Sequence, residues 1–264
     1  MTKIGVFDSG IGGLSVLNEA LRQLPGHEYV YLADSSNTPY GERPSEWVAN
    51  RSLKLCSWLI EEQSCEAIVV ACNTATAQAI AMIRDHFQST PIIGVEPGIK
   101  PAAALSPNKK IGVLATQSTL SSEKFKRLLE SLVGDCQFIT QAGLGLVPLI
   151  EKGNLNAPEL EELITKYVQT FVDFGADTLV LGCTHYPFLI PMIQKKFGNQ
   201  LQVIDTSSAI IKQLARKILV VPSQQTTRVK LFTTGDAQLI LDQTNHLIGC
   251  QNPNTQLEAV SVAL

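Results

Sequence analysis

Two cysteines in this chain lie at corresponding places in two similar segments. An apolar run over residues 67–71 ends at Cys72, and a second run over residues 178–182 ends at Cys183. Both runs are short and rich in branched residues, as buried parallel strands are. Ligands bind at the edge of a parallel sheet where strands end and the chain turns toward helices. Paired thiols at such edges suggest a reaction that needs one acid–base group on each face of a substrate.

The similarity extends beyond the cysteines. Residues 3–8 resemble residues 110–115, and residues 91–96 resemble residues 201–205, in the same order and with nearly the same spacing. This repetition predicts an α/β fold made of two similar parallel-sheet α/β domains related by pseudo-twofold symmetry, with the active site in the cleft between them. We expect residues 1–97 and 208–264 to form the first domain, to which the chain returns, and residues 98–207 to form the second.

The hydrophobic periodicity predicts alternating strands and helices, typical of parallel α/β folds. The expected strands are 3–7, 28–33, 67–71, 92–95, 110–114, 136–140, 178–181, 201–204 and 228–233. The expected helices are 12–24, 45–63, 75–88, 98–105, 119–133, 157–174, 187–197, 207–219 and 235–247. A polar loop over 34–44 follows the second strand; its composition fits a substrate lid or a solvated loop equally well.

Composition narrows the classes of function. Hydrophobic residues make up 45% of the 264 residues, and the formal net charge is -3. No basic run suits nucleic acid, and no apolar run reaches the roughly 20 residues that span a bilayer. The six cysteines show no tight pairing, so we expect a cytoplasmic protein with reduced thiols and with neither nucleic acid nor a membrane as partner. They are Cys56, Cys65, Cys72, Cys136, Cys183 and Cys250.

Polar residues follow several of the predicted strands. Asp8 and Ser9 open a glycine-rich turn after the first strand, where backbone amides at a helix start favour an anion. The turn lacks the final spaced glycine of the dinucleotide fingerprint. A simpler interpretation is a glycine turn in which Asp8 or Ser9 caps the following helix. The position of Asp8 at the same sheet edge as Cys72 favours a functional role.

The residues directly after the two cysteines form a second pair of candidates. Asn73 and Thr74 follow Cys72, whereas Thr184 and His185 follow Cys183. Both pairs offer side-chain donors and backbone amides at an expected helix start, which suits an α-carboxylate. The spacing of Cys183 and His185 gives only two potential metal ligands, so we predict no metal site.

These motifs together resemble those of glutamate racemases. The resemblance rests on the DSGIGG turn after the first strand, on Pro39-Tyr40-Gly41, on the ACNTA motif around Cys72 and on the GCTHYP motif around Cys183. An ATQST motif, which begins at Ala115, is also similar. The matches run in family order from the start of the chain to its final third. Phe125 departs from the pattern, since a tyrosine is expected there.

The resemblance implies a cofactor-independent racemase that interconverts L- and D-glutamate and supplies D-glutamate for peptidoglycan. It implies a homodimer without a cofactor. It makes Cys72 and Cys183 the two acid–base groups, with Asp8, Glu151 and His185 as their polar catalytic neighbours. It places the following residues around the substrate: Asp8, Ser9, Tyr40, Gly41, Asn73, Thr74, Thr116, Thr119, Thr184 and His185.

The chemistry is coherent with two thiols. Racemisation removes the α-proton from one face and returns a proton to the other, so one cysteine must be a thiolate and the other a thiol. Because a free thiol titrates near pH ~8.5, thiolate formation needs a dipole or a charged partner. Asp8 would oppose a thiolate at Cys72, so it either accepts a proton or holds the substrate ammonium.

Three alternatives remain open at this point. An aspartate racemase, or a racemase of another acidic amino acid, would share the two-cysteine design. An amino-acid binding module would explain the polar loops but not the paired thiols. A dithiol redox protein would use both cysteines, although the chain has no Cys-x-x-Cys motif.

Overall fold

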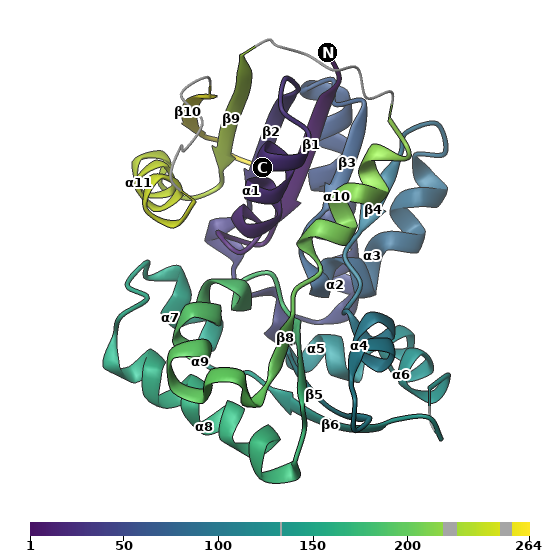
Figure 1. Cartoon of the computed structure of the whole chain (residues 1–264). Coiled ribbons are helices and arrows are strands. Elements are labelled where there is room, and N and C mark those ends of the chain that lie inside the picture. The colour runs from purple at the N-terminus through teal and green to yellow at the C-terminus, as the bar shows by residue number, and fades with distance from the viewer. Residues whose placement is uncertain (133, 219–225, 249–254) are drawn as a thin grey trace. The chain divides into compact units, whose positions relative to one another are not determined.

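The computed structural model describes residues 1–132, 134–218, 226–248 and 255–264 (Figure 1). Contacts between residues divide the chain into two compact units. Unit 1 is Met1–Val95 with Ser207–Leu264, and unit 2 is Glu96–Thr206. Residues 133 and 219, the last positions of two expected helices, lie outside the described residues, as does Cys250. No helix among those described is long and apolar enough to cross a membrane.

Every strand pairs in parallel with its neighbours. In chain order the strands are β1 (Lys3–Asp8), β2 (Glu28–Ala33), β3 (Ala67–Val70), β4 (Ile92–Gly94), β5 (Lys110–Ala115), β6 (Gln137–Ala142), β7 (Thr178–Gly182), β8 (Gln202–Ile204), β9 (Thr227–Thr233) and β10 (Thr255–Ser261). The α-helices are α1 (Leu14–Gln23), α2 (Ser45–Ser57), α3 (Asn73–His86), α4 (Ile99–Leu105), α5 (Gln117–Ser121), α6 (Glu123–Glu130), α7 (Leu146–Glu151), α8 (Pro158–Phe174), α9 (Ile190–Phe197), α10 (Ser207–Ala215) and α11 (Ala237–Leu247).

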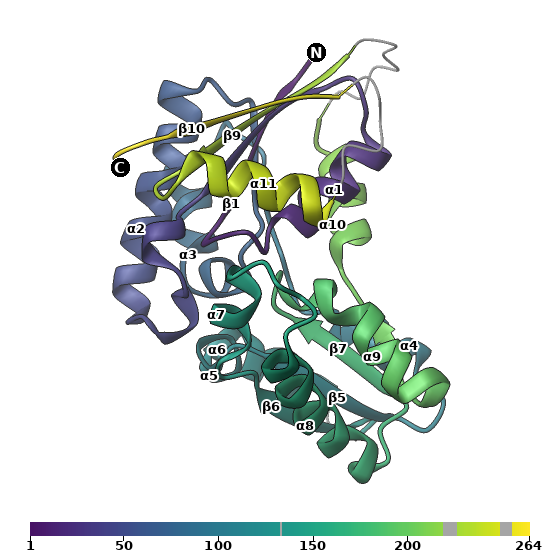
Figure 2. The same ribbon diagram turned by 90° about the vertical axis from the view of Figure 1, so that its left-hand side faces the viewer.

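Unit 1 is a six-stranded sheet in the order β10-β9-β2-β1-β3-β4. Helices α2 and α3 lie on one face, and α1, α10 and α11 lie on the other (Figure 2). The central strands are buried on both faces and therefore consist of near-continuous apolar residues. The core between α2, α3 and the sheet contains Phe7, Leu32, Val70 and Leu55.

Unit 2 is a four-stranded sheet in the order β6-β5-β7-β8. This order repeats the β2-β1-β3-β4 part of unit 1 strand for strand. Helices α8 and α9 lie on one face, whereas α4, α5 and α6 lie on the other (Figure 1). The expectation of two parallel-sheet α/β units is therefore confirmed, and strands β9 and β10 with helix α11 are an extension that only unit 1 carries.

Equivalent glycines in the two central strands show how closely the repeat is kept. A Cβ at Gly5 would lie 2.6 Å from Ile68 Cδ1, and a Cβ at Gly112 would lie 2.6 Å from the ring of Phe171. Each glycine therefore lets a large side chain lie directly on the middle strand. The two strands occupy the same place in their sheets and meet the same packing demand.

Several expected elements differ in the structure. The single helix expected over 119–133 is two helices, because Ser122 ends α5 and its hydroxyl caps α6 by accepting from Phe125 N. The helix expected over 45–63 ends as α2 at Ser57 and continues as a π-helical turn. Helix α7 and strand β10 were not expected. The helix expected from 187 starts as a 3-10 turn over Tyr186–Leu189, before α9.

Candidate active site

In unit 1 the predicted site residues follow three adjacent strands at their carboxyl ends. Asp8 is the last residue of β1, Tyr40 lies in the loop after β2, and Cys72 follows β3. Strands β2, β1 and β3 are neighbours in the sheet. Because the carboxyl ends of parallel strands meet at one edge, these residues gather within one sheet edge of unit 1.

Cys72 is both a strand end and a helix cap. It is the N-cap residue of α3, where its Sγ accepts a hydrogen bond from Ala75 N at 3.4 Å. Its thiol also reaches Ser9 Oγ at 3.8 Å, and only 5% of the residue is exposed. The N-terminus of a fourteen-residue helix carries a partial positive charge. That dipole favours a thiolate at Cys72.

Asp8 is fully buried beside this cysteine's strand. Its Oδ1 accepts a hydrogen bond from Gly10 N at 3.0 Å, which fixes the glycine-rich turn that includes Ser9. The main-chain oxygen of Asp8 accepts from Asp34 N at 3.0 Å, which ties β1 to the loop after β2. The turn thus holds the Asp8 carboxylate at the sheet edge while its backbone remains part of the sheet.

Asn73 and Thr74 form the first turn of α3 and are both buried. Within the described residues, Asn73 Nδ2 has no hydrogen-bond partner although it is inaccessible to solvent. A buried amide donor without a partner costs roughly 1–3 kcal/mol. Such a donor next to Cys72 is suited to donate a hydrogen bond to a ligand oxygen.

The loop after β2 is anchored by two buried side chains, Asp34 and Tyr40, although Ser36 and Glu42 are exposed. Tyr40 is 1% exposed, its ring meets Trp47 edge-on at 5.4 Å between centroids, and its hydroxyl donates to Asp34 Oδ2 at 2.5 Å. Burial, followed by the charge of Asp34, raises the pKa of Tyr40. Gly41 lies next to it in a 3-10 turn over Tyr40–Glu42. The packing of this loop was not apparent from its polar composition.

In unit 2, Cys183 has a side-chain partner of a different kind. It follows β7, and its Sγ lies 3.7 Å from His185 Nδ1. On the other side of the imidazole, His185 Nε2 lies 2.5 Å from Glu151 Oε1, on the last residue of α7. The structure therefore joins three predicted site residues in one chain of contacts. Without the resemblance, the sequence around Glu151 gives no sign of this contact.

The surroundings of His185 determine its charge. Burial lowers the pKa of the imidazole, but the interactions with Cys183 and Glu151 outweigh burial and raise the pKa well above its usual value. The imidazolium is thus favoured at neutral pH. A buried cation at this distance from Cys183 stabilises a thiolate and can hold a proton near the sulfur.

Three threonines complete the predicted set in unit 2. Thr116 follows β5 and caps α5, accepting from Thr119 N at 3.2 Å; the two hydroxyls are 2.9 Å apart. Thr119 is buried, and so is Thr184, which lies between Cys183 and His185. Strands β6, β5 and β7 are neighbours, so these side chains and Glu151 gather at the carboxyl edge of the second sheet.

Two residues with a place at this edge escaped the sequence reasoning. Asp34 is the first residue after β2; it is fully buried and pairs with Arg51 from α2 at 2.6 Å. Its position could have indicated a role, because Asp34 directly follows β2 and Asp8 is the last residue of the neighbouring strand β1. Arg51 gave no such signal, since a lone arginine on a helix usually faces solvent.

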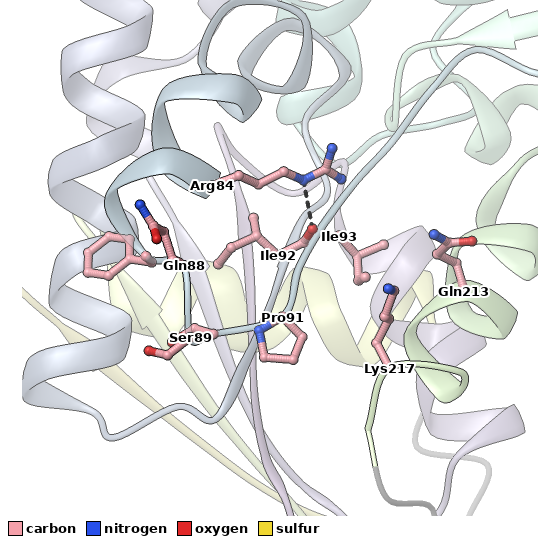
Figure 3. A pocket seen from close by; sticks show the side chains of 10 residues that line it. Arg84, Gln88, Ser89, Pro91, Ile92, Ile93, Gln213 and Lys217 are labelled. Carbon is pink, nitrogen blue, oxygen red and sulfur yellow. Dashed lines mark hydrogen bonds between the residues drawn. The ribbon is translucent and has the colours of Figure 1, made fainter.

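A pocket of about 460 Å³ lies elsewhere in unit 1 (Figure 3). Arg84, Ile92, Gln213 and Lys217 are among its lining residues, and Arg84 Nε donates to the main-chain oxygen of Ile92 at 3.1 Å. None of the predicted site residues lines it. It borders the start of β4, away from the carboxyl ends that carry the cysteine.

The fold and the residues at the strand ends define an α/β racemase. The model of the Asp/Glu/Hydantoin racemase family matches residues 5–214. The chain therefore belongs to the Asp/Glu/hydantoin racemase family. It is 49% identical to a glutamate racemase of Cupriavidus pinatubonensis over 98% of this chain and 95% of that protein. A glutamate racemase of Ralstonia pickettii is 50% identical over 88% of this chain and 83% of its own.

Solved structures agree with this assignment. A glutamate racemase isoform of Bacillus anthracis superposes with a TM-score of 0.85 at 29% identity, covering 98% of this chain and 97% of its own. A glutamate racemase of Escherichia coli, solved with L-glutamate and the activator UDP-MurNAc-ala, gives a TM-score of 0.83 at 27% identity over 98% and 99%. Both share the two-sheet architecture with this chain.

Proposed function

We propose that this enzyme interconverts L-glutamate and D-glutamate without a cofactor. The observation that carries the proposal is the placement of Cys72 and Cys183 after equivalent strands, β3 and β7, of a repeated sheet. Relatives that match nearly the whole chain are named glutamate racemases. One related structure was solved with D-glutamate and another with L-glutamate.

In the proposed reaction, one cysteine serves each face of the substrate α-carbon. A thiolate takes the α-proton and becomes a thiol, leaving a carbanion-like intermediate. The other cysteine, initially a thiol, gives its proton to the opposite face and becomes a thiolate. The reverse direction exchanges the two roles, so no electrons or groups are transferred other than protons.

The α-proton is weakly acidic, so the intermediate needs preorganised donors. The unpartnered amide of Asn73 beside Cys72 supports a role in binding the substrate carboxylate. Ser9, Tyr40, Gly41 and Thr74 would complete the substrate contacts in unit 1. Thr116, Thr119, Thr184 and His185 would do so in unit 2.

The polar neighbours have different proposed roles. His185, backed by Glu151, would hold a proton next to Cys183 and stabilise its thiolate. Asp8 would either accept a proton or bind the substrate ammonium, because a second anion beside Cys72 disfavours a thiolate there. We further propose that the D-glutamate supplies peptidoglycan synthesis in the cytoplasm and that the enzyme acts as a homodimer.

Proton NMR of the purified enzyme with L-glutamate in D₂O tests the proposal. Loss of the α-proton signal, with D-glutamate in a chiral assay and no added cofactor, is the expected result. Exchange with aspartate but not glutamate would keep the two-thiol mechanism and change the substrate. Exchange with neither would overturn the racemase proposal in favour of a binding protein.

The thiols need a separate check against redox chemistry. Treatment with a mild oxidant should leave the number of free thiols and the racemase activity unchanged. Activity that requires alternating oxidation and reduction would contradict the proposed mechanism.

A further inference from the structure

The loop after β2 is organised around one buried carboxylate. Asp34 Oδ1 accepts hydrogen bonds from Asn37 Nδ2 at 3.0 Å and from Thr234 Oγ1 at 2.9 Å. Its Oδ2 accepts from the Tyr40 hydroxyl at 2.5 Å. These bonds join residues from the loop itself with a residue that follows β9, about 200 positions away in the sequence.

Arg51 from α2 neutralises this carboxylate. Its Nε donates to Asp34 Oδ2 at 2.8 Å and its Nη2 donates to Oδ1 at 2.6 Å, the bidentate geometry that suits a guanidinium. The remaining Nη1 donates to the main-chain oxygen of Leu264 at 2.9 Å. Arg51 therefore connects α2, the loop after β2 and the segment that follows β10.

The carboxylate is held in its charged form. Burial acts to raise the pKa of Asp34, but the hydrogen bonds from Arg51, Tyr40 and Asn37 outweigh burial and lower it. A buried ion pair contributes little net stability compared with an apolar pair of the same shape. A five-donor arrangement around one buried anion is therefore better explained by the geometry it imposes than by stability.

What Asp34 holds in place is part of the predicted substrate site. Its side chain fixes Tyr40, next to Gly41, and its main-chain N–H donates to the oxygen of Asp8 at 3.0 Å. The Tyr40 hydroxyl has one proton and donates it to Asp34. The hydroxyl oxygen can then only accept a hydrogen bond, so it would repel a substrate carboxylate rather than bind it.

We propose that Asp34 and Arg51 are positioning residues that hold the Tyr40–Gly41 turn in its substrate-binding geometry, and that the Tyr40 hydroxyl acts through Asp34 rather than on the substrate. The inference deepens the proposed racemase function and depends on it. It also gives a role to the extension of unit 1, since Thr234, which follows β9, and Leu264, which follows β10, both bond to the pair.

The test is a double-mutant cycle in the full-length enzyme. We expect Asp34→Asn to raise KM for both enantiomers about tenfold while kcat changes less, because it weakens charged hydrogen bonds that set the binding geometry. Tyr40→Phe removes only the hydroxyl and should raise KM by a smaller factor. The double variant should match Asp34→Asn, because both changes break the same interaction.

Glu258→Gln is the matched control. It makes the same acid-to-amide change in the same unit, at an exposed ion pair with Lys230 in which Glu258 is 64% exposed. We expect it to leave KM and kcat unchanged. Arg51→Lys keeps the charge but loses the bidentate geometry, and it should raise KM like Asp34→Asn.

The outcomes separate this inference from the proposed function. A wild-type enzyme that exchanges no α-proton of glutamate contradicts the proposed function itself. With an active wild type, multiplicative effects of Tyr40→Phe and Asp34→Asn would show that the hydroxyl contacts substrate independently, and would overturn the inference. A fall in kcat at constant KM would also overturn it. If Asp34→Asn does not fold, Tyr40→Phe and Arg51→Lys make the same comparison.

Discussion

The two cysteines occupy equivalent places in the repeated sheet but have different surroundings. Cys72 caps a long helix and takes its polarity from backbone amides, with Ala75 N at 3.4 Å. Cys183 precedes a short 3-10 turn and has a charged partner in His185 at 3.7 Å, backed by Glu151. The sulfurs therefore lie at equivalent places in the two sheets, but their polar neighbours differ: a helix N-terminus beside Cys72 and a histidine–glutamate pair beside Cys183.

This difference has a chemical consequence. A helix dipole is a fixed electrostatic feature, whereas an imidazolium can gain or lose its proton. The Cys183 side therefore carries a pH-dependent element within its own unit. On the Cys72 side, Asp8 ends the neighbouring strand β1, and its negative charge works against a thiolate. In a reversible reaction each sulfur must alternate between thiol and thiolate. The helix N-terminus beside Cys72 and the imidazolium beside Cys183 are two different ways to stabilise the thiolate.

The largest expected effect comes from removing either sulfur. Cys72→Ser and Cys183→Ser should each lower racemisation by at least about 10³-fold, the order of magnitude of a lost acid–base group. Both variants should keep the fold, since serine is smaller than cysteine. At position 72 the serine hydroxyl can also cap α3. Chiral assay of glutamate turnover measures the effect. Full activity in either variant would contradict the two-base proposal.

A one-base reaction then separates the two sides. Elimination of chloride from a 3-chloro analogue of glutamate needs only removal of the α-proton, with loss of chloride from the adjacent carbon. We expect each serine variant to retain elimination with one enantiomer, and the two variants to retain opposite ones. Equal behaviour toward both enantiomers would argue against opposite faces.

Removal of the Glu151 carboxylate should weaken the Cys183 side alone. We expect Glu151→Gln to lower kcat/KM about 10–100-fold, as loss of an orienting partner behind a histidine commonly does. Because the carboxylate helps raise the pKa of His185, the variant should lose its imidazolium at lower pH. The high-pH limb of the activity profile should therefore move toward acid. An unchanged profile would show that the proton on His185 is not used.

The same variant carries a stability prediction with a definite sign. The folded-state pKa of His185 is raised, so the stabilisation from its pairing is complete below the unfolded value near ~6.5 and is lost as the pH rises through the folded-state value. Glu151→Gln should thus lower the free energy of unfolding by about 1–3 kcal/mol at pH 6 and by less at alkaline pH. Denaturant titrations at the two pH values measure the difference.

The sequence was sufficient to predict the repeated sheets because their central strands, β1 and β3 in unit 1 and β5 and β7 in unit 2, are buried on both faces. Apolar runs such as 67–71 and 178–182 have few alternatives to a buried strand. Strand β10 escaped prediction because it lies at the sheet edge, where Gln256 and Glu258 alternate with apolar residues and the signal is weak. Helix α7 escaped because it is six residues long and contains Pro148.

The candidate site shows the same division. Residues that follow buried strands, such as Asp8 and Cys72, could be located from the pattern, since the strand ends determine where they lie. Partners that come from other elements could not. Arg51 lies on a helix face, and its pairing with Asp34 depends on how α2 packs on the sheet. Glu151 reaches His185 only because α7 forms, and no local pattern encodes that contact.

Asn73 offers a smaller and sharper test on the Cys72 side. We expect Asn73→Ala to raise KM about tenfold, because it removes one hydrogen bond to a charged substrate group. The variant should not lose stability, since Asn73 Nδ2 has no hydrogen-bond partner among the described residues. Steady-state kinetics and thermal melting of one preparation measure both quantities. A lower Tm with unchanged KM would assign Asn73 to the fold instead.

The smallest effect is expected at the helix cap of unit 2. Thr116 accepts from Thr119 N at the start of α5, which is the part that Cys72 plays for α3 in unit 1. Thr116→Ala should cost about 1 kcal/mol of stability, the usual value of a lost cap, whereas Thr116→Ser should restore it. If Thr116 also binds substrate, Thr116→Ala raises KM and Thr116→Ser does not, because the hydroxyl is retained. A loss of stability with unchanged KM would show that Thr116 only caps the helix. Unit 2 would then use separate residues for capping a helix and for acting on the substrate, two tasks that Cys72 combines in unit 1.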